Sequence, residues 1–206
     1  MSDITNNIQT GINHLMENDS CLRKIIEANP QCNLKPQRKY FLRLVEIIIA
    51  QQLSVRAAAT IYKRFTSYYQ GNISSSIILS TSDETLRNLG ISTNKVKFIK
   101  DIAQKIENKQ LNLKGIISKS EEEISRELIQ VKGIGVWSIH MFLMFTLCRL
   151  DVLPVGDLGI RKAVQNIYKL KSLPDEQTIA KIAKKNRWSP YSSIASWYLW
   201  RSLDNK

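Results

Sequence analysis

The hydrophobic pattern predicts a chain built almost entirely of helices. Apolar residues recur every three or four positions, the spacing that places them on one face of a helix. Stretches with this spacing lie at 4–15, 22–26, 40–48, 55–65, 96–106, 124–128 and 160–167. The apolar runs at 77–79 and 111–113 are short and give only a weak indication of strands. We therefore predict an all-α fold, a compact and two-lobed single domain over residues 1–206.

Polar residues indicate where several of these helices begin. Ser20 and Ser54 stand in N-cap positions, and Ser120 forms a capping-box pair with Glu123. We expect Val55 to face inward with the other apolar residues of the helix that Ser54 starts.

The composition is that of a folded domain outside membranes. The chain has 206 residues, of which 43% are hydrophobic, enough to bury a core. It has no run of about 18 apolar residues, and its first residues lack the pattern of a secretory signal. The cysteines Cys21, Cys32 and Cys148 are odd in number and widely spaced, which argues against a disulfide framework and a zinc site. We expect a cytoplasmic, nucleoid-associated protein if the source is bacterial and a nuclear one if it is eukaryotic, with no membrane partner.

The charge is strongly positive and unevenly distributed. Lysine and arginine number 30 against 18 acidic residues, a formal net charge of +12. Residues 161–206 alone hold ten basic and three acidic residues. One alternative is an ordinary solvated helix face, but the asymmetry favours a polyanionic partner, above all nucleic acid.

The segment 128–161 carries the most informative pattern. Lys132, Gly133, Ile134 and Gly135 separate two predicted helices, which form a helix–hairpin–helix at about 121–147. We expect both glycines to allow positive φ and close approach of another surface. The amides at the start of the second helix would then grip a DNA phosphate without reading sequence. A plain turn between two helices is the alternative interpretation.

Asp157 is the candidate catalytic residue, in a loop at 151–161 that leads into a further helix. Its position is that of an N-cap, where the helix dipole favours a negative charge. An anionic carboxylate beside a DNA-binding hairpin can also stabilise a sugar cation as it develops. The two roles are compatible.

Four segments in register then resemble a known family. The pair V-K-G-I-G-V-W and V-G-D (131–137 and 155–157) is similar to the signature of the helix–hairpin–helix (HhH-GPD) DNA glycosylase superfamily. Q-Q-L-S (51–54), L-G-I-S (89–92) and the stretch from W-S-P-Y to W-Y-L-W-R (188–201) resemble its alkylation-repair branch, the DNA-3-methyladenine glycosylases II. The likeness covers roughly residues 40–203.

The resemblance implies an all-helical fold of two lobes and a base excision reaction. Such enzymes flip an alkylated base out of the duplex and hydrolyse its N-glycosidic bond, leaving an abasic site. The substrates would be of the 3-methyladenine and 7-methylguanine class, which leave readily because they are cationic. Aromatic rings attract such cationic bases. Trp137 and Trp200 match the positions of the aromatic base pocket in the family. The alternative for Trp200 is an ordinary position in the core. Met141 replaces a second pocket aromatic.

The resemblance also assigns DNA contacts. Gln52, with Leu53 second, would fill the gap left by the flipped base; the alternative for Leu53 is a place in the core. Lys132, Gly133, Ile134, Gly135 and Arg161 complete the expected DNA-binding residues. Tyr62 and His140 are further pocket candidates, with a structural role as the alternative.

Three expectations concern lyase activity and cofactors. Bifunctional relatives carry a lysine where this chain has Trp137, which predicts hydrolysis without strand cleavage. An iron–sulfur cluster needs four cysteines near the C-terminus, and none follows Cys148. No cofactor is required, but the backbone carbonyls of Ile129, Val131 and Ile134 could hold a structural Na⁺ or K⁺ ion.

Two other functions remain open from the sequence. A non-catalytic helix–hairpin–helix module would explain the charge and the hairpin but not Asp157, Trp137 and Gln52 together. A related glycosylase for another lesion, such as ethenoadenine, would need a proton donor to a neutral base, and none stands out. We expect a monomer that acts on damaged double-stranded DNA.

Overall fold

The computed structural model describes residues 2–204 and is helical throughout that range. It has twelve α-helices, one short 3₁₀ helix and no strand among those residues, which confirms the predicted all-α class. The chain divides into two compact units. One holds the described residues up to Pro36 together with those from Leu143 onward, and the other holds Gln37–Phe142. No helix within 2–204 is both long and apolar enough to span a membrane.

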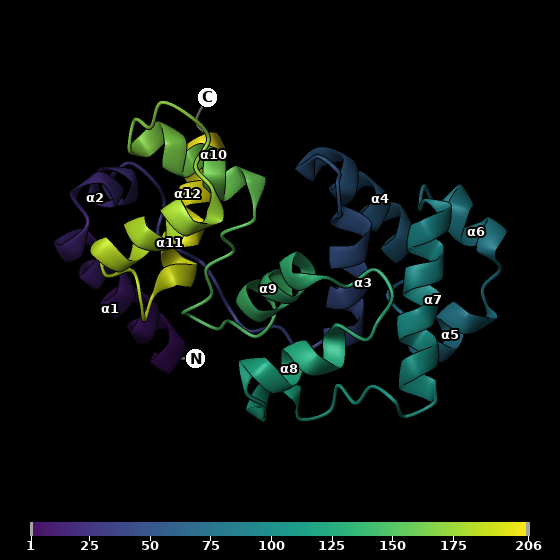
Figure 1. Ribbon diagram of the computed structural model, residues 1–206. Coiled ribbons are helices and arrows are strands. Elements are labelled where there is room, and N and C mark those ends of the chain that lie inside the picture. Colours follow the sequence, from purple (N-terminus) through teal and green to yellow (C-terminus); the bar gives the residue numbers. More distant parts are fainter. Residues whose placement is uncertain (1, 205–206) are drawn as a thin grey trace. The chain divides into compact units, whose positions relative to one another are not determined.

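The first unit joins segments from both ends of the chain. Figure 1 shows the purple N-terminal helices beside the yellow C-terminal one. Its helices are α1 (Ser2–Asn18), α2 (Ser20–Glu27), α10 (Leu158–Ile167), α11 (Glu176–Lys185) and α12 (Ser192–Asp204). The apolar stripe predicted at 4–15 packs here, since Ile8, Ile12 and Leu15 are buried. Trp188 and Tyr198 are the largest fully buried side chains of this core.

Asp19 is a buried carboxylate that ties three parts of this unit together. It caps α2, accepting hydrogen bonds at Oδ1 from the amides of Cys21 and Leu22 at 3.0 Å each. Its Oδ2 accepts from Trp188 Nε1 at 2.8 Å and from the Tyr168 hydroxyl. Burial and this bond raise the pKa of Tyr168. The predicted Ser20 cap is therefore wrong by one residue, because Ser20 is already the first residue of α2 and the amides of its first turn donate to Asp19.

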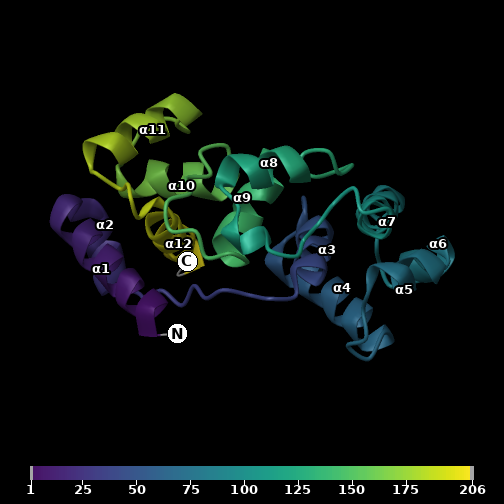
Figure 2. The same ribbon diagram turned by 90° about the horizontal axis from the view of Figure 1, so that it is seen from below.

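The second unit is built around α7. Its elements are α3 (Tyr40–Ala50), α4 (Val55–Tyr68), α5 (Ser75–Ser80), α6 (Asp83–Asn88), α7 (Thr93–Glu107), the 3₁₀ helix η1 (Ile116–Ser118), α8 (Glu121–Leu128) and most of α9 (Val136–Phe145). Helices α3, α5 and α6 all pack against α7, and Figure 2 shows α5 and α6 beside it. The apolar run at 77–79 lies in α5, so it belongs to a helix.

Two predicted helix starts in this unit are confirmed. Ser54 Oγ accepts from the amide of Ala57 at 3.3 Å. Ser120 and Glu123 form the complete capping box of α8. Val55 was expected to face inward, but 88% of its surface is exposed. It is the first residue of α4, whose buried side chain, Phe65, lies almost three turns further along the helix.

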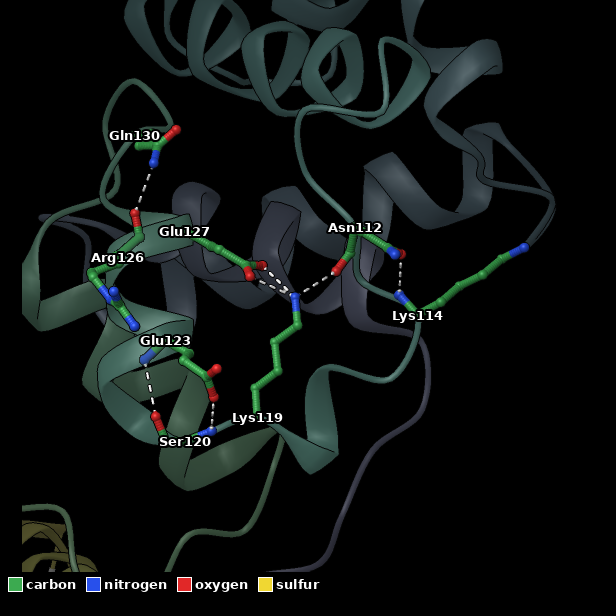
Figure 3. A network of polar contacts seen from close by, with 8 residues as sticks. All are labelled: Asn112, Lys114, Lys119, Ser120, Glu123, Arg126, Glu127 and Gln130. Atoms are coloured by element: carbon green, nitrogen blue, oxygen red, sulfur yellow. Dashed lines mark hydrogen bonds and ion pairs between the residues drawn. The ribbon is translucent and has the colours of Figure 1, made fainter.

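Polar contacts fix α8, the first helix of the hairpin motif (Figure 3). Lys119 Nζ donates to both carboxylate oxygens of Glu127, at 2.6 and 2.7 Å, and lies 3.5 Å from the carbonyl of Asn112. The capping box of Ser120 and Glu123 holds the N-terminus of α8. Both ends of α8 are thus anchored before the chain enters the hairpin.

Candidate active site

Asp157 begins α10 as its N-cap, as predicted. Its Oδ1 accepts a hydrogen bond from the Ile160 amide at 2.9 Å. The same oxygen accepts a second bond from Trp200 Nε1, also at 2.9 Å. The two donors fix the rotation of the carboxylate about the Cβ–Cγ bond. The side chain is half-buried.

Trp200 comes from the middle of α12, and its ring is backed by Phe145. The two ring centroids lie 5.6 Å apart with an interplanar angle of 38°. The sequence predicted Trp200 as a base-stacking residue, which stays a prediction; its hydrogen bond to Asp157 was not foreseen. Phe145 was also missed, because nothing in its spacing distinguishes it from the other apolar residues of α9.

A second carboxylate, Asp151, braces the loop that presents Asp157. It accepts from Ser189 Oγ at 2.5 Å and from Ser192 Oγ at 2.6 Å. Further along α10, Arg161 Nε donates to the carbonyl of Pro174 at 2.8 Å. The loop and the first turn of α10 are therefore held to neighbouring segments by side-chain hydrogen bonds.

The hairpin of the second unit depends on Gly133. Its φ is +78°, a conformation that favours glycine. A β carbon there would lie 2.1 Å from Phe98 Cδ2, so there is no room for any side chain. Gly135 differs from the prediction, because its φ is not positive and an added β carbon would meet nothing within 4 Å. Its carbonyl accepts the first hydrogen bond of α9, from Ile139 at 3.0 Å. Only the first glycine is therefore needed for the turn itself, while the second leaves open space at a helix start.

Contacts from other helices hold this hairpin in place. Gln51 Nε2 donates to the carbonyl of Gly133 at 2.7 Å and lies 2.9 Å from Ser138 Oγ. The amide of Lys132 donates to Asp101 Oδ2 at 2.9 Å. Ile134 is 96% buried and fixes the turn in the core. Sequence reasoning missed Gln51 as a hairpin partner, since 82 residues separate the two positions.

The predicted wedge residues lie in an unusual turn after α3, residues 51–53, called the wedge turn below. Gln52 is exposed and has a φ of +56°, which is costly for a residue with a β carbon. Lys95 Nζ supports this turn by donating to the carbonyls of Ile49 and Gln51, at 2.8 and 2.7 Å. Partial burial lowers the pKa of Lys95. Leu53 is 39% exposed, so the alternative that places it in the core is wrong.

The remaining pocket candidates of this unit have different surroundings. Met141 is buried in α9, and Trp137 is half-buried at the start of that helix. Burial and the nearby carboxylate of Glu46 raise the pKa of Tyr62 to about 12. Burial lowers the pKa of His140, which lines a cavity of about 250 Å³ with the exposed Ile129. Both side chains are therefore neutral near pH 7.

The family model for "HhH-GPD superfamily base excision DNA repair protein" matches residues 45–188. The chain belongs to this superfamily. The match spans the wedge turn, the hairpin and Asp157, and the family resemblance drawn from the sequence is confirmed.

Individual members of the HhH-GPD superfamily are similar over most of their length. An alkylbase DNA glycosidase-like protein of Schizosaccharomyces pombe is 31% identical over 194 residues, which cover 91% of this chain and 90% of that protein. A putative DNA-3-methyladenine glycosylase of Bacillus subtilis is 28% identical, covering 97% of this chain and 70% of its own. The solved structure of an S. pombe 3-methyladenine DNA glycosylase in complex with abasic DNA aligns with a TM-score of 0.87 at 28% identity, covering 95% of this chain and 97% of that one.

Proposed function

We propose that this HhH-GPD protein is a monofunctional DNA glycosylase that removes alkylated bases from double-stranded DNA. The observation that carries the proposal is Asp157, whose Oδ1 accepts hydrogen bonds from the Ile160 amide and from Trp200 Nε1. The relatives support the substrate class, since those described above are named for alkylated bases or for 3-methyladenine.

The reaction breaks the bond between C1′ of the sugar and the nitrogen of the base. The bonding electron pair leaves with the base, which is already cationic when alkylated and departs as a neutral molecule. Positive charge develops on the sugar, and the Asp157 carboxylate stabilises it. A water oxygen then bonds to C1′, and its proton passes to the carboxylate or to solvent. The product is an abasic site in an unbroken strand.

We further propose that the enzyme leaves the DNA strand uncut. A lyase needs an amine that attacks C1′ in place of water. Trp137 stands at the position of that amine and has no nucleophilic nitrogen. Lys95, another amine near the wedge turn, donates to two backbone carbonyls.

DNA binding is proposed to be largely independent of sequence. Hairpin amides and basic side chains contact phosphates, and such contacts do not read bases. Gln52 would enter the stack where the base has left, with Leu53 beside it. The exposure of both side chains supports that role.

A monovalent cation at the hairpin remains part of the proposal. The fit is supported by Ile129, the C-cap of α8, because carbonyls at a helix C-terminus lack helical partners and carry partial negative charge. Val131 O accepts from the Ile134 amide at 3.1 Å, which leaves its second lone pair for an ion. Together with the carbonyl of Ile134, these oxygens would hold Na⁺ or K⁺ and link the hairpin to a phosphate, with no part in bond cleavage.

Base release from methylated duplex DNA tests the function. We expect alkylated bases to be released and identified by chromatography, and strands to break only after alkali. Borohydride trapping should give no covalent protein–DNA adduct. DNA binding without base release would favour a non-catalytic module, and release confined to ethenoadenine would favour the other glycosylase class. A trapped adduct would contradict the monofunctional assignment.

A further inference from the structure

We propose that Gly159 is a positioning residue for base excision, because it leaves the space through which the Trp200 indole reaches Asp157. The proposal rests on the proposed glycosylase function and adds a residue to its machinery. Gly159 is the second residue of α10, two positions after the carboxylate. Its proposed role needs no contact with base or sugar and is exerted only through Trp200.

The space around Gly159 is filled by the two partners of one hydrogen bond. A β carbon built there would lie 2.9 Å from Trp200 Cδ1 and 3.0 Å from Trp200 Nε1. It would also lie 3.0 Å from Asp157 Oδ1. These are the ring edge and the oxygen that the 2.9 Å bond joins. A methyl group would therefore push the donor and the acceptor apart.

The indole ring has little freedom to yield. Phe145 packs on Trp200 with its centroid 5.6 Å away. Asp157 is held in turn by the Ile160 amide, because it caps α10. The strain of an added methyl group is therefore relieved most easily by loss of the Trp200–Asp157 bond.

That bond has a chemical consequence for the reaction. An N–H donor stabilises the ionised carboxylate and fixes the plane in which both of its oxygens lie. Stabilisation of a sugar cation depends on the charge being present and correctly oriented before the bond breaks. Glycine at 159 does not serve backbone conformation, since its φ is not positive and alanine is the better helix former there.

Three variants test the proposal: Trp200→Phe, Gly159→Ala and the double variant. Trp200→Phe removes the donor but keeps a ring on Phe145. Under single turnover on methylated duplex DNA, we expect each single variant to excise about tenfold or more slowly, as expected for loss of a hydrogen bond to a charged group. The double variant should be no slower than the slower single one, because both changes remove the same bond. Affinity for abasic DNA and the melting temperature of Gly159→Ala should change little.

The matched control is Trp197→Phe, the same substitution three residues earlier on α12. Trp197 is buried and packs on Tyr198 and Arg201. We expect it to lower stability without the tenfold loss of excision. A wild-type rate in Gly159→Ala would overturn the proposal. The proposal would also be overturned if the rate losses of the two single variants multiplied in the double variant and abasic DNA bound more weakly. That result would show that the methyl group blocks DNA directly.

A readout that does not need activity separates this proposal from the glycosylase function. The chain has four tryptophans, so four indole N–H signals are expected in a ¹⁵N-labelled NMR spectrum. The Trp200 signal should exchange slowly with solvent in the wild type and quickly in Gly159→Ala. Its position should also move in Asp157→Asn. If the wild type released no base but these signals behaved as expected, the function would fail and the contact would stand. Unchanged exchange in Gly159→Ala would refute the contact whatever the activity.

Discussion

The side chain of Gln51 donates a hydrogen bond to the carbonyl of Gly133, and so joins the wedge turn to the hairpin within one unit of the protein. Lys95 Nζ donates a hydrogen bond to the backbone carbonyl of the same glutamine. The two turns with expected DNA contacts are thus held by one short chain of hydrogen bonds. Their geometry depends on residues that need not touch DNA.

Gln51→Ala should therefore weaken DNA binding without removing a DNA contact. The variant leaves the Gly133 carbonyl and Ser138 without this partner, which should cost about 1–3 kcal/mol of unfolding free energy. We expect weaker binding to intact and abasic duplexes alike, measured by titration. Gln110→Ala, on an exposed side chain after α7, is the control and should change neither quantity. A stable variant with unchanged binding would show that the bond does not hold the hairpin.

Asp157→Asn should fold and bind DNA but lose base excision. Asparagine is a good N-cap and keeps an oxygen that can accept from Ile160 and Trp200. The negative charge is lost, so we expect the single-turnover rate to fall by at least about 10²-fold. Abasic-DNA affinity and thermal stability report on the fold. A rate near that of the wild type would mean that Asp157 is only a cap.

The two hairpin glycines should respond differently to alanine. Gly133→Ala forces a β carbon into a left-handed conformation and against Phe98, and should cost about 2 kcal/mol or more in stability. Gly135→Ala meets no atom within 4 Å, and alanine in place of glycine at an N-cap should cost no more than about 1 kcal/mol. We expect Gly135→Ala to lower the melting temperature much less than Gly133→Ala does, but to bind every duplex more weakly, because the methyl group stands between the backbone and the phosphate. Equal loss of stability in both variants would contradict this distinction.

Gln52→Gly should separate stability from function. Glycine accepts the positive φ of this turn, so the variant should be as stable as the wild type or up to about 1 kcal/mol more stable. It lacks the wedge, so its preference for abasic over intact DNA should shrink, and Gln52→Ala should show the same loss of preference. Leu53→Ala is the comparison. If the preference survives in Gln52→Gly and disappears in Leu53→Ala, leucine is the wedge.

Salt dependence gives an independent check on the phosphate contacts behind these predictions. Affinity for undamaged duplex should fall steeply with salt, with a slope of about −0.9 in log–log form for each phosphate neutralised. Lys184→Ala and Lys185→Ala, in the last turn of α11, should each lower that slope by about one if the residue contacts a phosphate. A slope near zero in the wild type would argue against a nucleic-acid partner.

Local patterns in the sequence determined the helices, several of their caps and the family. Periodicity depends on neighbours three or four positions apart, so Ser54, the Ser120–Glu123 box and the Asp157 cap were all visible without a fold. The glycines of the hairpin and the charge asymmetry could also be recognised from the sequence. These features need only the chain itself.

Only the tertiary structure decided which partners those residues meet. Asp19, and not the predicted Ser20, caps α2, and its carboxylate also binds Trp188 and Tyr168, which lie 169 and 149 residues away in sequence. The bonds of Gln51 to the hairpin and of Trp200 to Asp157 likewise join distant segments. Such contacts depend on how helices pack, and no local pattern encodes the distance between two atoms that the chain brings together only when it folds.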